Sequence, residues 1–385
     1  SKVTLDTETR LLMAFSPRII SQILSMNKFA AVIPAGLALA LAACSPQAPT
    51  AAPGSSQTPV ASAPNKASGA TVSIAGAGAS APDPLYQRWF KEYNQKNPNV
   101  QITYQSVGSG AGIKQFIAKT VDFGATDSAL KKDEKAQFPA DRGVAIQVPS
   151  TGLFVVFAYN LDGVKGLKLS RETFCGIADG SIKKWNDEKV KKDNAGATLP
   201  DTDVTFVYRS DGSGTTSIFT KHIEKACPNW KAGSGKTVEW PAGTGAKGNE
   251  GVTALIKQTK GSIGYTEYSF AKATALDMAT LQNKAGDFIV PTPEAAAKAL
   301  MGVKIPEDFA VSVPDPEAKE AYPIVSLTWL LFYSKYEDQG KADALKAFTK
   351  WALTDGKTFA AELGYIPLPE EVVTKVNTAV DVIGK

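Results

Sequence analysis

The chain has 385 residues, of which 43% are hydrophobic and 21% are charged. This composition is typical of a soluble globular protein, and the length is enough for two domains and a substantial core. The 42 lysines and arginines nearly balance the 38 aspartates and glutamates, so the overall charge argues against the strong basic field of a nucleic-acid-binding protein.

The first seventy residues do not have the pattern of a folded domain. Residues 1–25 precede Met26 and are interpreted as an over-extended start, with Met26 as the initiator. Residues 26–43 predict a lipoprotein signal peptide, because a lysine precedes an apolar stretch shorter than the roughly 20 residues of a transmembrane helix. The stretch ends in a Leu-Ala-Ala-Cys sequence that resembles a lipobox, so Cys44 is expected to be acylated. A buried helix and an ordinary signal peptide are the alternatives.

Residues 44–70 consist mostly of alanine, proline, serine, glutamine and threonine, with almost no large apolar side chain. Such a segment cannot bury enough surface to offset the entropy that it would lose on ordering. We therefore expect a flexible linker that joins a lipid anchor to the folded part. A linker of this kind suits an exported protein whose folded part must reach a membrane partner.

Short apolar strands alternate with amphipathic helices from residue 71 onward. Glycine-rich turns lead from several of these strands into the helices that follow. This recurring unit predicts an α/β fold with ligand chemistry at the carboxyl ends of strands and the amino ends of helices. The sequence contains no internal repeat that would indicate a solenoid. The strands are expected at 71–75, 100–104, 121–127, 153–159 and 204–208.

Three of the glycine-rich turns place hydroxyl side chains next to the start of a helix. They carry Ser80, Ser109, and the pair Ser213 and Thr215. A helix N-terminus offers free backbone N–H groups and a partial positive charge, glycine allows a close approach, and hydroxyls add donors. Together the turns predict an anion site, although helix capping is the plainer explanation for any one of them alone.

Three charged residues complete the predicted site. Arg209 follows a strand and has the planar donor fork that suits an oxyanion, and Asp211 is placed to hold its guanidinium. Asp127 would repel an anion unless the anion carries a proton to donate, so it favours phosphate over sulfate. The alternatives are a surface charge for Arg209 and the N-cap of a helix beginning at Ser128 for Asp127.

Other motifs do not support catalysis or metal binding. Residues 233–237 resemble part of a Walker A loop, but Trp230 occupies the position of its first glycine. His222 is the only histidine, which argues against a His-rich metal site and a His-based triad. Ser213 lacks the outer glycines of a nucleophile elbow. We therefore expect no enzyme activity, no metal and no cofactor.

With Cys44 assigned to acylation, Cys175 and Cys227 remain. An even pair of cysteines in an oxidising compartment suggests a disulfide. Two free thiols are the alternative, because nothing in the sequence shows that the two residues are close to each other.

Four segments of the chain carry a family resemblance. They are Gly76-Ala77-Gly78-Ala79-Ser80, Val121-Asp122-Phe123-Gly124-Ala125-Thr126-Asp127, Arg209-Ser210-Asp211-Gly212-Ser213-Gly214-Thr215 and Gly261-Ser262-Ile263-Gly264-Tyr265. Together they resemble the periplasmic phosphate-binding proteins of high-affinity phosphate ABC transporters, which belong to the class II periplasmic-binding-protein superfamily. The resemblance covers about residues 71–385 in the right order, and the combination is far more specific than any single loop.

The resemblance implies a two-lobed α/β fold with a hinge and a ligand cleft between the lobes. Ser80 and Ala81 would bind phosphate through a hydroxyl and a backbone N–H, and Ser109 would donate likewise. Asp127 would accept the phosphate proton. The family usually has Thr-Phe where this chain has Ser-Ala, so the hydroxyl is kept while an aromatic ring is lost at that edge of the cleft.

The other implied ligands come from the second lobe. Arg209 would pair with the anion, and Asp211 would orient the guanidinium. Ser213, Gly214 and Thr215 would supply hydroxyl and backbone donors.

The resemblance also implies how the chain is divided and what it meets. Lobe I is expected at 71–158 plus 322–385 and lobe II at 159–321. Binding would close the hinge, and the closed form would dock on ABC permease subunits in the inner membrane. We expect a monomer that is held in the periplasm or cell envelope by the lipid at Cys44.

Two other classes of function remain open. The first is a secreted phosphatase or phosphotransferase that uses Ser213, which would need a base or metal that the sequence does not offer. The second is a protein of the same fold that binds another oxyanion or acts as a surface adhesin.

Overall fold

The computed structural model describes residues 69–385 of the chain. The predicted signal peptide, Cys44 and nearly all of the predicted linker lie outside these residues. Among the helices of residues 69–385, none is both long enough and apolar enough to span a membrane.

Nine strands form one sheet that runs through both lobes of the molecule. They are β1 (Val72–Gly78), β2 (Val100–Ser106), β3 (Phe123–Thr126), β4 (Ala145–Asn160), β6 (Thr205–Arg209), β7 (Thr244–Ala246), β8 (Ser262–Glu267), β9 (Asp277–Met278) and β12 (Val325–Tyr333). Their order is β2-β1-β3-β12-β4-β8-β6-β7, and β9 pairs with β4. A separate three-stranded sheet has the order β11-β10-β5 and is made of β5 (Lys168–Leu169), β10 (Thr280–Gln282) and β11 (Phe288–Ile289).

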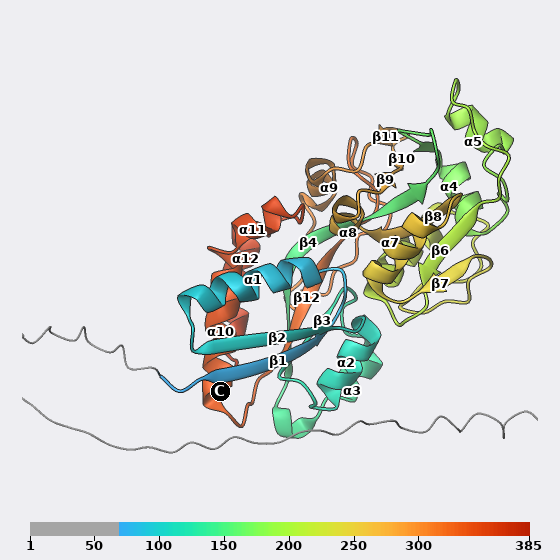
Figure 1. Ribbon diagram of the computed structural model, residues 1–385. Helices are drawn as coiled ribbons and strands as arrows, with labels where there is room; N and C mark the ends of the chain where they lie inside the picture. The colour runs from blue at the N-terminus through green and yellow to red at the C-terminus, as the bar shows by residue number, and fades with distance from the viewer. Residues whose placement is uncertain (1–68) are drawn as a thin grey trace, which may run out of the picture. The chain divides into compact units, whose positions relative to one another are not determined.

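The two long antiparallel strands β4 and β12 join the halves of this sheet (Figure 1). Residues 145–154 of β4 pair with β12, whereas residues 155–160 pair with β8. We call the half that contains β1, β2, β3 and β12 lobe I, and the half that contains β6, β7 and β8 lobe II. A strand shared by both halves gives the lobes a common hydrogen-bonded hinge.

Helices cover both halves of the sheet (Figure 1). Those of lobe I are α1 (Asp83–Lys96), α2 (Ser109–Ile117), α3 (Lys132–Ala136), the 3₁₀ turn Ala140–Arg142, α10 (Gln339–Leu353), α11 (Lys357–Glu362) and α12 (Glu370–Val380). Those of lobe II are α4 (Arg171–Ala178), α5 (Glu188–Asp193), α6 (Gly214–Ala226), α7 (Gly248–Gln258), α8 (Tyr268–Ala273) and α9 (Pro293–Leu300).

The strand, glycine turn and helix unit predicted from the sequence recurs along the chain. The parallel strands β1, β2, β6 and β7 lead into α1, α2, α6 and α7 respectively. In α1 the apolar residues recur at helical spacing and are buried; they are Leu85, Tyr86, Trp89, Phe90 and Tyr93. This connectivity brings the amino ends of four helices to the carboxyl edges of the sheet, where the two lobes face each other.

Several element boundaries differ from the prediction. Helix α2 begins at Ser109, within the glycine-rich turn, so the turn itself is helical. No helix begins at Ser128, since α3 starts only at Lys132. The alternative role of Asp127 as the N-cap of such a helix is therefore wrong.

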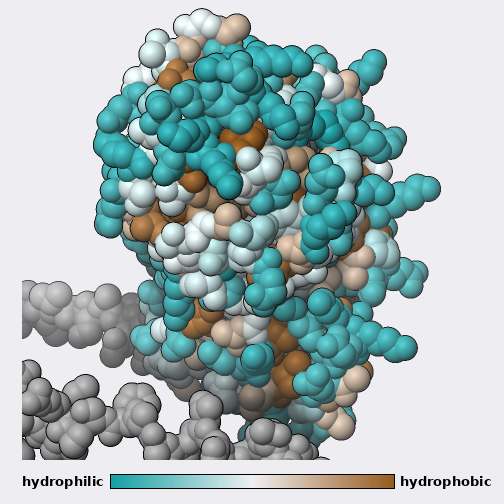
Figure 2. Space-filling model, turned by 90° about the vertical axis from the view of Figure 1, so that its right-hand side faces the viewer, coloured by the Kyte–Doolittle hydropathy of each residue, from teal (hydrophilic) through white to brown (hydrophobic). Residues whose placement is uncertain are grey.

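Cys175, in α4, and Cys227, at the end of α6, form a disulfide with a Cα–Cα distance of 5.5 Å. The bridge ties together two helices of lobe II at the end of α6 that is remote from its glycine-rich start. The face of the molecule seen in Figure 2 is mostly hydrophilic, and its apolar residues lie in small separate groups. That face lacks the broad apolar patch that marks a stable protein interface.

Candidate functional site

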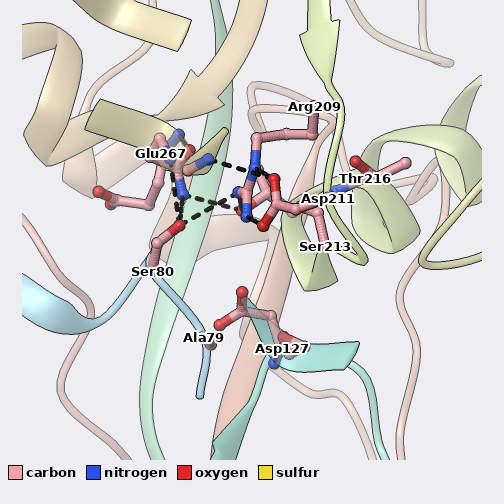
Figure 3. Close-up of polar contacts among 12 residues, drawn as sticks. Ala79, Ser80, Asp127, Arg209, Asp211, Ser213, Thr216 and Glu267 are labelled. Carbon is pink, nitrogen blue, oxygen red and sulfur yellow. Dashed lines mark hydrogen bonds and ion pairs between the residues drawn. The ribbon is translucent and has the colours of Figure 1, made fainter. Parts of the chain in front are cut away.

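The turns after β1, β2, β6 and β7 meet between the lobes, together with the end of β3. Figure 3 shows Ser80, Asp127 and Arg209 of this site. Ser80 and Ser109 come from lobe I, and their side chains are 1% and 0% exposed. Arg209 and Thr215 come from lobe II and are 4% and 0% exposed. Residues from five separate segments therefore enclose one polar site that is closed to solvent.

The Arg209 guanidinium is held in place from both sides. Its Nε and Nη2 donate to the two carboxylate oxygens of Asp211, at 2.7 and 2.6 Å. Its Nη1 donates to Ser80 Oγ at 3.1 Å, across the boundary between the lobes. Burial opposes the ionised form of Asp211, but the bonds from Arg209 outweigh it and hold the pKa of Asp211 below its usual value. The pair presents a fixed cation at the site, so the surface-charge alternative for Arg209 is wrong.

The amino end of α6 supplies donors from lobe II. Ser213 is its N-cap, and its Oγ accepts from the backbone N–H of Thr216 at 2.9 Å. The N–H groups of Gly214 and Thr215 are the first of the helix and have no acceptor within it. A Cβ on Gly214 would lie 2.5 Å from the Cβ of Asp127, so only glycine permits this approach of the two lobes.

Ala81 and Ser109 belong to lobe I. The backbone carbonyl of Ala81 accepts from the hydroxyl of Tyr365 at 2.6 Å, which holds the turn after β1 in place. Ser109 Oγ accepts from the backbone N–H of Asp127 at 3.1 Å, so its own proton is free to be donated. These contacts order the lobe I side of the site.

Asp127 follows β3 and is 3% exposed. Its Oδ1 accepts from Thr328 Oγ1 at 2.8 Å, and its carboxylate is directed toward Ser80 and Arg209 (Figure 3). Burial raises the pKa of Asp127 to about 6, against the lowering effects of Thr328 and of the charge on Arg209. At neutral pH this side chain is therefore mainly an ionised acceptor in a site otherwise made of donors.

The sequence did not reveal Asn249, which is fully buried at the start of α7. Its Nδ2 donates to Ser80 Oγ at 2.8 Å and to Thr215 Oγ1 at 3.1 Å. The signal that could have found it is the turn after β7, which repeats the pattern of strand, glycine and helix in a weaker form. Glu267 was missed as well. It is fully buried beside this network, and burial raises its pKa to about 8.

Two further contacts hold the lobes together around the site. The backbone N–H of Gly110 in α2 donates to the carbonyl of Gly212 at 2.9 Å. Lys236 of lobe II forms an ion pair with Glu134 of α3 at 2.6 Å. The structure thus has the closed arrangement in which donors of both lobes face one small volume.

Of the possible catalytic residues, Ser213 lies in this site as the N-cap of α6. His222 is buried in α6 with its ring 5.6 Å from that of Phe174, and burial lowers its pKa to about 4. Residues 69–385 contain no group of three His, Cys, Asp or Glu side chains that could hold a metal ion. The site itself combines a cation held by Asp211, several hydroxyls, helix N-termini from both lobes and the acceptor carboxylate of Asp127, which suits a small oxyanion that carries a proton.

Residues 63–356 match the family described as a PBP superfamily domain. The chain is 42% identical over 315 residues to the phosphate-binding protein PstS of Pasteurella multocida, an alignment that covers 79% of this chain and 88% of that protein. It is 39% identical over 318 residues to the PstS of Haemophilus influenzae, with 80% and 92% coverage.

Solved structures show the same fold. A high-affinity periplasmic phosphate-binding protein, PfluDING, bound with phosphate, has a TM-score of 0.68 and 22% identity, and the match covers 82% of this chain and 99% of that one. A putative phosphate ABC transporter substrate-binding protein from Clostridium perfringens has a TM-score of 0.57 and 17% identity, with 77% and 100% coverage.

Proposed function

The chain belongs to the PstS family of phosphate-binding proteins within the PBP superfamily, and we propose that it captures inorganic phosphate between its lobes for a phosphate ABC transporter. Ser80, Ala81, Ser109 and Asp127 act from lobe I. Arg209, Ser213, Gly214 and Thr215 act from lobe II, with Asp211 orienting the guanidinium. The protein binds and releases its ligand unchanged.

The observation that carries this assignment is the buried carboxylate of Asp127 among anion donors. A carboxylate in that place repels a fully ionised anion, whereas it accepts a hydrogen bond from an anion that still carries a proton. Inorganic phosphate is protonated near neutral pH and sulfate is not. Asp127 therefore supports phosphate as the ligand and selects against sulfate.

The enzyme alternative lacks support in the residues around Ser213. A serine nucleophile needs a base within hydrogen-bonding reach, but Ser213 Oγ accepts from the backbone of Thr216 and caps α6. His222 is buried two turns along the same helix, with a pKa that is lowered to about 4. We therefore propose a carrier that acts without catalysis, metal or cofactor.

The lobe boundaries, location and partners complete the proposal. We place lobe I at 71–158 plus 322–385 and lobe II at 159–321; the change of β4 partners after residue 154 supports a crossing near there. We propose a monomer in the periplasm or cell envelope, anchored by lipid at Cys44. Its closed form delivers phosphate to the permease subunits in the inner membrane.

Calorimetry of the purified protein, freed of carried-over phosphate, tests the assignment. We expect saturable one-to-one binding of phosphate and little response to sulfate. In Asp127→Asn the preference for phosphate over sulfate should fall by about tenfold or more, since a charged hydrogen bond contributes about 1.5–3 kcal/mol. Asp141→Asn, at an exposed carboxylate paired with Lys119, is the matched control and should leave the preference unchanged.

Two outcomes would contradict the assignment. Equal binding of both anions by the unaltered protein would keep the lobed carrier but remove the role given to Asp127. Hydrolysis of a chromogenic phosphate ester that Ser213→Ala abolishes would instead favour the enzyme.

A further inference from the structure

Asn249 joins the ligand hydroxyls of the two lobes. Its Nδ2 donates to Ser80 Oγ of lobe I and to Thr215 Oγ1 of lobe II, at 2.8 and 3.1 Å. Its backbone N–H also donates to Ser80 Oγ, at 3.2 Å. The side chain is fully buried, so water does not compete for these bonds.

The orientation of the Asn249 amide is fixed from its other end. Asn249 Oδ1 accepts from the backbone N–H of Glu267 at 2.9 Å and from Thr266 Oγ1 at 3.0 Å. A backbone N–H can only donate, so the amide oxygen must face Glu267. The amide NH₂ is thereby directed at the two ligand hydroxyls.

The hydroxyl of Ser80 receives three hydrogen bonds from groups that can only donate. They come from Arg209 Nη1, the Asn249 backbone and Asn249 Nδ2. A hydroxyl has two lone pairs and one proton, so incoming donors occupy all its acceptor capacity. Thr215 Oγ1 likewise receives Asn249 Nδ2 and, at 3.5 Å, Arg209 Nη1. Within residues 69–385 neither hydroxyl donates to a protein acceptor.

We propose that Asn249 is a positioning residue that turns the Ser80 and Thr215 hydroxyls into obligatory donors aimed at the bound oxyanion. Because Ser80 lies in lobe I and Asn249 in lobe II, this orientation is complete only when the lobes are closed. Closure of the lobes therefore orients the hydroxyl protons of Ser80 and Thr215 in addition to enclosing the site. The inference rests on the proposed function, and it adds a determinant that does not touch the ligand.

The first test compares phosphate affinity in variants. Asn249→Ala removes both side-chain bonds. Ser80 Oγ keeps the donors Arg209 Nη1 and the backbone N–H of residue 249, whereas Thr215 Oγ1 keeps only the 3.5 Å contact from Arg209 Nη1 and becomes free to rotate, so phosphate affinity should fall by about tenfold. Thr266→Val is the matched control, because it removes a bond to the same amide but leaves Glu267 to hold the amide oxygen. Its affinity should change by less than about threefold.

The second test reads the proton positions directly in the unaltered protein. Neutron diffraction from deuterated protein crystallised with phosphate should show the deuterium of Ser80 Oγ and that of Thr215 Oγ1 on the lines to phosphate oxygens. A deuterium directed toward Asn249 or another protein acceptor would overturn the inference, whatever Asn249→Ala does to stability. This readout does not depend on the folding of any variant.

The outcomes separate the inference from the proposed function. If the unaltered protein does not bind phosphate, the proposed function fails. If it binds phosphate and Asn249→Ala binds equally well, only the role of Asn249 fails. Loss of affinity in Asn249→Ala together with ligand-directed deuteriums in the neutron map would support both.

Discussion

Lys236 of lobe II lies with its Nζ 2.6 Å from Oε1 of Glu134 in lobe I, and the two side chains are only 13% and 16% exposed. The backbone carbonyl of Lys236 accepts from the N–H of Ser213, the N-cap of α6, at 2.9 Å. A single residue, Lys236, therefore connects the ion pair between the lobes to the proposed ligand-binding turn after β6. A second ion pair joins Lys135 of α3 to Asp308. Its Nζ–Oδ2 distance is longer, at 3.4 Å, and both side chains are largely exposed.

The ion pair between Lys236 and Glu134 should therefore help to keep the lobes closed. In Lys236→Met we expect phosphate affinity to fall about fivefold, equivalent to about 1 kcal/mol, mainly through faster release. Stopped-flow measurement of phosphate dissociation checks this. Lys135→Met, at the exposed pair, is the control and should release phosphate at the original rate. Equal acceleration in the two variants would mean that general charge, and not the buried pair, controls release.

The selectivity against sulfate should weaken in acid. Burial raises the pKa of Asp127 to about 6, so the side chain is ionised at pH 8 and mostly protonated at pH 5. A protonated carboxyl can donate to sulfate, and sulfate affinity should rise by about tenfold per unit as pH falls from 8 to 6, then level off. Calorimetry at each pH measures it. Asp127→Asn should show a flat profile, and a parallel slope in this variant would place the titrating group elsewhere.

Glu267 should make the ligand-free protein less stable as pH rises. Burial raises its pKa to about 8, against bonds from Ser269, so between pH 4.5 and 8 the folded state holds a proton that the unfolded state has lost. The stability that this proton provides is present below pH 4.5, lost as pH rises to about 8, and absent above it, at a slope of at most about 1.4 kcal/mol per unit. Urea unfolding across this range checks the slope. It should flatten in Glu267→Gln, and an unchanged slope would contradict the assignment.

The disulfide should stabilise lobe II without affecting the ligand. Cys175 and Cys227 are 52 residues apart in sequence, and a loop of this length corresponds to about 4 kcal/mol in the chain-entropy description. The double variant Cys175→Ala/Cys227→Ala should unfold at a lower temperature by calorimetry. Its phosphate affinity at 20 °C should be unchanged, because the bridge joins the end of α6 opposite to the ligand-binding turn. Reduction of the unaltered protein should reproduce the loss of stability.

Local sequence patterns were sufficient to predict those parts of the site that are formed by residues close together in the chain. Arg209 and Asp211 are two residues apart, and their pairing follows from the turn after one strand. Ser213 and Thr215 were found because a glycine turn followed by a helix N-terminus has a recognisable chemistry. The α/β fold was predictable for the same reason, since hydrophobic period and turn residues are local signals.

The tertiary structure alone decided which distant residues complete the site. Asn249 meets Ser80 across 169 residues of sequence, and Thr328 meets Asp127 across 201. No local sequence pattern identifies these partners. Asn249 reaches Ser80 only when the two lobes are closed, and Thr328 reaches Asp127 because β12 pairs with β3 inside lobe I. The sequence by itself determined the donors, the cation and the carboxylate. The orientation of these groups depended on packing between segments far apart in the chain. The same packing buries Asp127 and so raises its pKa.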